Sequence, residues 1–155
     1  MIRKTFYTLP VLFLMLVLVA GCSKNDADAD VNTGQEDVTG SWSVTGIQSD
    51  RAYDWDGNGS TETDIFGTYS VCNRNIVYVF ETGGTGRVSE GCTAPFVNIS
   101  WQLSGRRLTV QGVPSGDINL DLIPSNAGTL KGTDDINVNG TSYRVTYTFT
   151  KRVRG

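Results

Sequence analysis

The sequence of 155 residues contains no histidine. Without an imidazole the chain cannot form a Ser-His-Asp or Cys-His nucleophile, nor a zinc site with histidine ligands. It also lacks an excess of basic residues, with 13 Lys and Arg against 16 Asp and Glu. An acidic chain has no electrostatic means of holding a phosphate backbone. We therefore expect a protein that is not an enzyme and that does not bind nucleic acid.

Apolar runs are scarce, and the longest one stands near the N-terminus, from Leu9 to Ala20 after the basic residues Arg3 and Lys4. It is shorter than the roughly 20 residues of a membrane-spanning helix and typical of a secretory signal. The run ends in "VAGC", and small residues before a single cysteine resemble the lipobox of bacterial lipoproteins. We expect a signal peptide over residues 1–21, with palmitate or another fatty acid on Cys22. An ordinary signal peptide with an incidental cysteine is the alternative.

The segment after the lipobox contains few large apolar residues. Residues 23–39 read "SKNDADADVNTGQEDVT", a composition that cannot bury enough surface to order itself. We interpret residues 22–39 as the lipidated cysteine and a flexible acidic tether, followed by one domain over residues 40–155. An aspartate after Cys22 would resemble an inner-membrane retention signal, but Ser23 stands there. The outer membrane, on its periplasmic face or at the cell surface, is therefore the expected location.

Two of the three cysteines remain after Cys22 is assigned to the lipid, namely Cys72 and Cys92. An even pair in an exported protein favours a disulfide. Closing a loop of about 20 residues would stabilise the fold by roughly 3 kcal/mol. Two free thiols are the alternative.

Residues after Gly40 alternate between apolar and polar side chains in short runs. In "TSYRVTYTFT" every second residue from Tyr143 to Phe149 is apolar or aromatic, which is the period of a half-buried strand. No window shows the period of an amphipathic helix, and turns rich in Gly, Asn and Ser separate the runs. We read Asp134 and Asp135 as a solvated pair in such a turn. The runs predict eight strands, near residues 41–49, 75–81, 86–90, 97–104, 107–112, 117–123, 128–133 and 142–151.

Short links between these strands require each to pair with the next in antiparallel order. Eight such strands can close into an up-and-down barrel, which has no exposed edge and can hold one small ligand. A flattened barrel and a two-sheet β-sandwich would give nearly the same pattern. The prediction is an all-β domain, with the closed barrel as its principal form.

Several motifs of the domain resemble a known family. Gly40-Ser41-Trp42 resembles the Gly-x-Trp first strand of lipocalins. The order of "DWDGNGSTETDI", "NIVYVFETGGTGRVSEGC", "GRRLTV" and "YRVTYTFTKR" is similar to that of lipocalin-like lipoproteins of Gram-negative bacteria. The resemblance implies an antiparallel barrel on a lipid anchor. It does not imply a chemistry, because one fold serves many functions.

The inward aromatic residues leave two functions open, and we expect a filled core and a structural, interaction or surface-display module, with a carrier as the alternative. They could line a pocket for a small apolar ligand, or they could fill the core of a small barrel. A concave apolar mouth of at least about 300 Å³ would favour a carrier. A filled barrel would favour a structural or surface-display module that presents residues 50–73 to a protein partner. The aromatic residues concerned are Trp42, Tyr78, Phe80, Trp101, Tyr147 and Phe149.

The stretch "DWDGNGSTETD" brings four carboxylates into eleven residues. On the calcium-loop template the glycine of position six is present, but position twelve is Ile65 instead of the bidentate glutamate. Oxygen ligands alone favour calcium, with an affinity of about 10⁻⁴ to 10⁻³ M and a structural role. A plain acidic turn is the alternative. The predicted ligands are Asp54, Asp56, Asn58, Ser60, Glu62 and Asp64.

Overall fold

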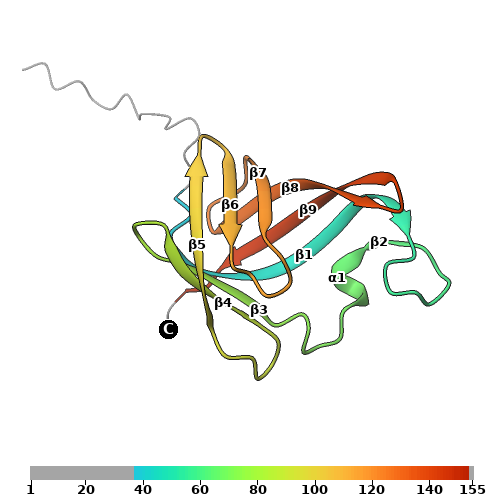
Figure 1. Ribbon diagram of the computed structural model, residues 1–155, viewed down its shortest axis with the longest axis horizontal. Helices are drawn as coiled ribbons and strands as arrows, with labels where there is room; N and C mark the ends of the chain where they lie inside the picture. Colours follow the sequence, from blue (N-terminus) through green and yellow to red (C-terminus); the bar gives the residue numbers. More distant parts are fainter. Residues whose placement is uncertain (1–36, 154–155) are drawn as a thin grey trace, which may run out of the picture. The chain divides into compact units, whose positions relative to one another are not determined.

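The computed structural model describes residues 37–153, which form a single antiparallel sheet and one short helix (Figure 1). The predicted signal peptide, Cys22 and most of the predicted tether lie outside the described residues. Among residues 37–153 no helix has the length and apolar character needed to cross a membrane. The elements are β1 (Gly40–Tyr53), β2 (Glu62–Asp64), α1 (Ile65–Thr68), β3 (Ile76–Phe80), β4 (Thr85–Glu90), β5 (Val97–Ser104), β6 (Arg107–Gln111), β7 (Ile118–Ile123), β8 (Thr129–Val138) and β9 (Thr141–Lys151).

The sheet closes because β1 pairs with β3 on one side and with β9 on the other. Strands β3 to β9 follow one another in sequence order, so eight strands complete the circle, and β2 is an additional short strand on β1. The predicted eight-stranded, antiparallel, lipocalin-like up-and-down barrel is confirmed. The pairing of β1 with β9 decides against the open two-sheet sandwich, because β9 would there be a free edge.

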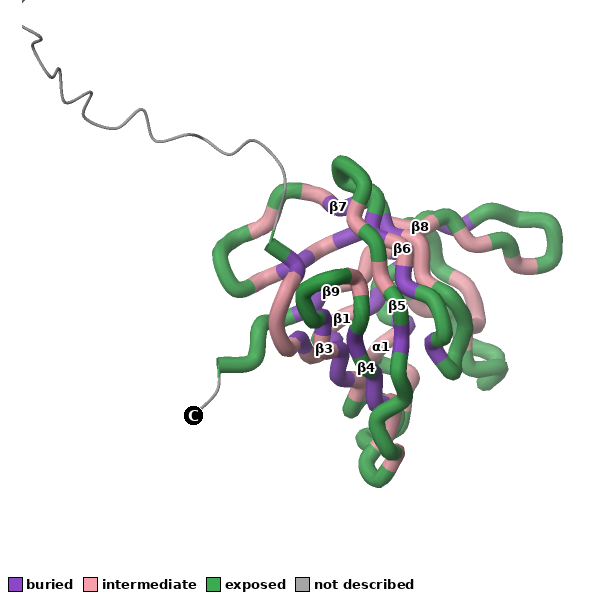
Figure 2. The backbone as a smooth tube through the Cα atoms, turned by 60° about the vertical axis from the view of Figure 1, so that its left-hand side comes forward, coloured by how far each residue is buried: buried purple, intermediate pink, exposed green. Residues whose placement is uncertain are grey.

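Alternation along the strands fills the interior, and Figure 2 shows buried positions along the strands and exposed positions mainly in the connections. One end of the barrel is packed with aromatic side chains. There the Trp42 Nε1 donates to the Val38 carbonyl at 2.9 Å. Val38 is only 2% exposed, so the core begins two residues before the boundary at residue 40. Trp42 also pairs with Lys151, so β1 begins and β9 ends at this packed end.

The predicted strand limits need correction in two places. β1 continues past residue 49 to Tyr53, and β8 continues past residue 133 to Val138. The β8 extension is held by pairing with β9, and the β1 extension pairs at Tyr53 with Glu62 of β2. The prediction that Asp134 and Asp135 lie in a turn is therefore wrong, since both are in β8.

The helix α1 was not expected, because one helical turn is too short to show a helical period. The Asp64 carboxylate caps it by accepting a hydrogen bond from the Gly67 backbone N–H at 2.9 Å. Its residue Ile65 is buried in the core, and Phe66 and Tyr69 pack against the core as well. In Figure 1, α1 lies next to β1 and β2.

The predicted disulfide between Cys72 and Cys92 is confirmed. It joins the segment that follows α1 to the loop between β4 and β5. The long connection between β1 and β3 is thus fixed to the β4–β5 loop shortly before β3 begins.

Candidate functional site

A cavity of about 440 Å³ occupies the end of the barrel where β3 and β7 begin and β4 ends. Its volume is within the range of about 300 to 1,000 Å³ that small-molecule sites occupy. Strands, the segment after α1 and the β6–β7 loop all contribute to its wall. The lining residues are Val44, Ile47, Tyr69, Asn73, Ile76, Tyr78, Glu90, Ser115, Gly116, Asp117, Ile118, Asp134, Ile136, Tyr147 and Phe149.

Strands β1, β3 and β9 supply the apolar and aromatic part of the wall. Val44 is opposite Phe149 and Ile47 is opposite Tyr147 in the pairing of β1 with β9. Directly opposed residues of an antiparallel pair share a face, so all four side chains point inward. The Tyr78 ring from β3 meets the Phe149 ring edge to face at 5.9 Å. This side of the cavity offers aromatic and aliphatic surface to a ligand.

Three carboxylates form the polar part of the wall. The Glu90 carboxylate accepts hydrogen bonds from the Ser115 backbone N–H at 3.1 Å and from the Ser115 hydroxyl at 2.7 Å. The Asp117 carboxylate accepts from the Gly112 N–H at 2.8 Å. Asp134 accepts from the N–H of its neighbour Asp135 at 2.9 Å. No lysine or arginine of residues 37–153 lines the cavity.

The tyrosines of the wall respond to these carboxylates. Burial, and then the charge of Glu90, raises the pKa of Tyr69. Burial and then the charge of Glu90 are also the two largest causes that raise the pKa of Tyr78. Burial, followed by Tyr69 and Asp134, raises the pKa of Tyr147 to about 12. All three phenols therefore stay protonated at neutral pH and can donate hydrogen bonds.

Only half of the aromatic residues predicted to line a pocket do so, namely Tyr78, Tyr147 and Phe149. Trp42 and Phe80 are in the buried core away from the cavity wall. Trp101 packs on Phe80 at 5.6 Å, and its Nε1 donates to the Glu81 and Thr85 carbonyls at 3.1 and 2.8 Å. These three residues fill the packed end, so the barrel is partly filled and partly hollow.

Sequence reasoning missed the carboxylates and Tyr69. Glu90 shares the inward alternation of Gly86 and Val88, and Asp134 shares that of Leu130 and Gly132. That alternation could have predicted that both carboxylates point into the barrel. Tyr69 follows the short helix and has no periodic signal of its own.

The acidic loop brings three of the six predicted calcium ligands together. One carboxylate oxygen each from Asp54, Asp56 and Glu62 lies within 4.8 Å of the others. The Asp54 carboxylate accepts from the backbone N–H groups of Asn58 and Gly59 at 2.9 and 3.0 Å. Hard oxygen donors in such a group suit calcium better than a transition metal.

The other three predicted ligands have different partners. Asn58 donates its side-chain N–H to Asp56 at 3.0 Å, and its side-chain oxygen accepts from the Ser60 N–H at 2.8 Å. Asp64 caps α1 and is not a member of the carboxylate group. The structure therefore reduces the carboxylates of the candidate calcium site from four to three.

Aromatic stacking fixes the loop to the barrel. The rings of Tyr53, Trp55 and Tyr143 meet edge to face, with centroids 5.0 to 5.5 Å apart. The Trp55 backbone N–H donates to the Glu62 carboxylate at 2.8 Å. Within the described residues the Trp55 Nε1 is buried without a hydrogen-bond partner. Trp55 is thus between Asp54 and Asp56 in sequence and bonded to Glu62 through its backbone, so its fluorescence should report on a change in the carboxylate group.

A comparison with protein families gives one match. The model described as "Domain of unknown function (DUF5004)" matches residues 20–115, which is more than half of the chain. The chain belongs to the DUF5004 family. The DUF5004 match contains β1 to β6, the acidic loop and both cysteines of the disulfide. No curated protein and no solved structure matches the chain, and the description of DUF5004 assigns no activity.

Proposed function

We propose that this protein is a membrane-anchored, lipocalin-like lipoprotein that carries a small apolar molecule in its barrel. The cavity of about 440 Å³ carries the proposal. A barrel whose core was fully packed would leave no such space, because protein interiors are normally filled to crystal-like density. The aromatic and aliphatic wall would gain about 25 cal/mol for each Å² of apolar surface removed from water.

The anchor in this proposal is the acylated Cys22 in the outer membrane, which rests on the "VAGC" motif and Ser23 alone. The proposal contains no catalytic step, since the chain has no histidine and a carrier needs only reversible binding.

Fluorescence titration with an uncharged apolar dye, N-phenyl-1-naphthylamine, tests the carrier function. We use the complete mature chain with Cys22→Ser, so that no detergent competes for the cavity. Saturable enhancement is expected. Ile118→Trp fills part of the cavity wall and should abolish the enhancement, whereas Val71→Trp, at an exposed position outside the cavity, should not. A wild-type response that does not saturate would contradict the carrier function.

A second candidate function is a surface-display module that presents residues 50–73 to a protein partner. It is favoured by the ordered fold of that segment, in which β2 and α1 support an exposed Val71. An empty cavity in native mass spectrometry of detergent-free protein would favour this function. A stoichiometric co-purifying molecule would favour the carrier.

A further inference from the structure

We propose that the ligand of this cavity carries a protonated amine on a compact apolar body. This inference rests on the proposed carrier function and names the chemical class of its ligand. It follows from the position of the carboxylates, the absence of a cation beside them among residues 37–153 and the apolar wall that faces them.

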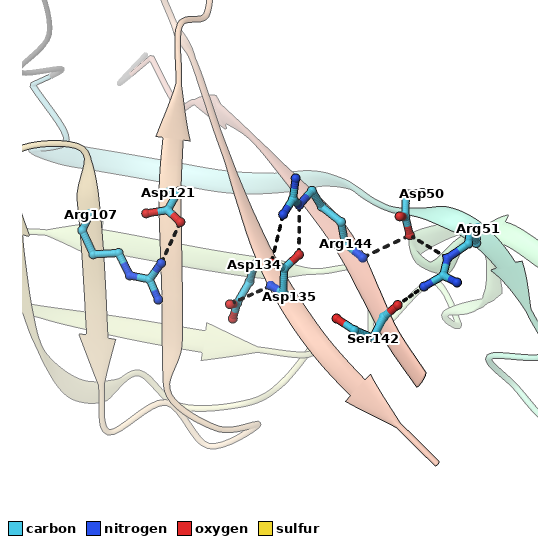
Figure 3. Close-up of polar contacts among 8 residues, drawn as sticks. All are labelled: Asp50, Arg51, Arg107, Asp121, Asp134, Asp135, Ser142 and Arg144. Carbon is cyan, nitrogen blue, oxygen red and sulfur yellow. Dashed lines mark hydrogen bonds and ion pairs between the residues drawn. The ribbon is translucent and has the colours of Figure 1, made fainter. Parts of the chain in front are cut away.

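The carboxylates on the outside of the barrel have arginine partners. Figure 3 shows Arg107 on Asp121 and Arg144 on Asp135, with nitrogen–oxygen distances of 2.7 and 2.9 Å. Asp50 accepts from the Arg144 backbone N–H and lies 3.8 Å from the Arg51 guanidinium. The arginines of this face are thus already engaged with outer carboxylates.

The carboxylates of the cavity have no such partner. Among the described residues, none of Glu90, Asp117 and Asp134 forms an ion pair. Their hydrogen bonds come from backbone N–H groups and from the Ser115 and Tyr78 hydroxyls, which are neutral donors. Three negative charges therefore border one cavity without a protein cation to balance them.

Asp134 is the most informative of the three. It is directly opposite Val145, which is fully buried, so its side chain belongs to the inward face of β8. Asp134 also borders an outer groove next to Arg107 and Arg144, yet those guanidinium groups bond to Asp121 and Asp135. An inward carboxylate in the middle of a barrel strand is costly to desolvate unless donors or a cation meet it, and among the described residues Asp134 has one hydrogen-bond donor, the neutral Asp135 N–H.

The tyrosines of the wall respond to the same carboxylates. Glu90 contributes to the raised pKa of Tyr69 and Tyr78, and Asp134 to that of Tyr147, each after burial. The raised pKa values mean that the ionised, negatively charged form of each phenol is disfavoured in the cavity. The faces of the same rings attract a cation through their quadrupole. The wall therefore favours cations over anions in two ways.

The two kinds of wall also orient the ligand. The apolar body would contact Val44, Ile47 and Phe149, which come from β1 and β9. The ammonium group would meet Glu90 at the end of β4 and Asp134 in the middle of β8. Electrostatic attraction is stronger in such a partly buried site than in water.

Isothermal titration with three phenyl ligands of similar size tests the inference on the complete mature chain carrying Cys22→Ser. The ligands are 2-phenylethylamine, 2-phenylethanol and 3-phenylpropionate, which differ mainly in charge. The amine should bind at least about tenfold more tightly than the alcohol, as a charge-assisted hydrogen bond allows. The acid should bind most weakly.

Substitutions then locate the effect. The double variant with Glu90→Gln and Asp134→Asn should bring the amine-to-alcohol affinity ratio close to one while the alcohol still binds. Glu81→Gln is the matched control, because Glu81 follows β3 outside the cavity wall. It should leave the ratio unchanged.

Two outcomes separate the inference from the proposed function. If the alcohol binds as tightly as the amine, or the acid binds best, the amine inference is overturned and the carrier function stands. If none of the three ligands binds, both are overturned. The comparison of ligands on the wild-type cavity decides this even where a variant fails to fold.

Discussion

At the scale of single residues, Tyr147 shows how a strand position becomes part of a site. It lies opposite Gly132 and beside Ile47, so its ring points into the barrel. Burial, and then Tyr69 and Asp134, hold its pKa at about 12. The ionised phenolate is therefore disfavoured in the folded protein and accepted in the unfolded chain.

We predict that alkaline pH destabilises the barrel through this residue. An unfolded tyrosine ionises near pH 10, so the unfolded chain binds fewer protons than the folded protein above that pH. The free energy of unfolding should fall by about 1.4 kcal/mol per pH unit per such tyrosine between about pH 10 and pH 12. Below pH 10 the contribution is fully present.

Urea unfolding at a series of pH values measures this effect. Tyr147→Phe should reduce the slope by about one proton, and the remaining slope should come largely from Tyr78, whose pKa is also raised. Tyr53, outside the cavity wall, provides the control substitution Tyr53→Phe. Equal slopes for wild type and Tyr147→Phe would contradict the prediction.

The residues that line the site were predictable only where apolar and polar side chains alternate along a long strand. Alternation along β9 correctly predicted that Tyr147 and Phe149 point inward, because the two-residue period continues through a strand of 11 residues. The alternation of β8 was not followed as far as Asp134, because the two aspartates made the residues after 133 resemble a turn. What holds them in β8 is backbone pairing with β9, a tertiary effect that local composition does not contain.

At the scale of elements, the disulfide between Cys72 and Cys92 controls the segment that follows α1. That segment supplies Tyr69 and Asn73 to the cavity wall. We predict that Cys72→Ser with Cys92→Ser lowers the free energy of unfolding by roughly 3 kcal/mol and weakens binding of the apolar dye. The barrel should still form, because no strand pairing depends on the bond.

Thermal and urea unfolding of the oxidised, reduced and double-variant proteins provide the measurement. The reduced wild type should match the double variant. Equal stability of all three forms would show that the rest of the fold holds the segment.

The loop between β1 and β2 carries the candidate calcium site. We propose that Asp54, Asp56 and Glu62 bind calcium with an affinity of about 10⁻⁴ to 10⁻³ M, which would relieve the repulsion among their charges. Trp55 stacks on Tyr143 beside this group, so calcium should change its fluorescence and raise the melting temperature of chelator-treated protein.

Two matched substitutions make the calcium test specific. Asp56→Asn should abolish the response, whereas Asp64→Asn should preserve it, because Asp64 caps α1 instead of joining the group. Trp55→Phe should remove the signal but keep the rise in melting temperature. If millimolar calcium changes neither the fluorescence nor the melting temperature, the loop is a plain acidic turn.

At the scale of the whole molecule, the sequence was sufficient for an all-β domain with sequential antiparallel strands, and it favoured the barrel, whose closure the pairing of β1 with β9 establishes. Short Gly-rich and Asn-rich links require sequential antiparallel neighbours, and eight strands must pair the first with the last to remove both edges. The cavity was not predictable in the same way. Whether aromatic side chains fill a barrel depends on which end each one occupies, as the contrast between Trp42 and Tyr147 shows.

The lipid anchor is a prediction about the whole chain. Labelling with a clickable fatty acid should tag the wild type and not Cys22→Ser. The variant with Cys72→Ser and Cys92→Ser should keep the label, because those two cysteines belong to the folded domain. Equal labelling of wild type and Cys22→Ser would contradict the lipobox interpretation.

The position of the two ends of the folded domain determines how the cavity can be presented. β1 begins and β9 ends side by side at the packed end, where Trp42 pairs with Lys151, whereas the cavity lies where β3 and β7 begin. A bilayer, a sensor surface or a fused reporter attached through either end would therefore leave the cavity mouth unobstructed. Exchange of a ligand with the surrounding solution would then not depend on which end is attached.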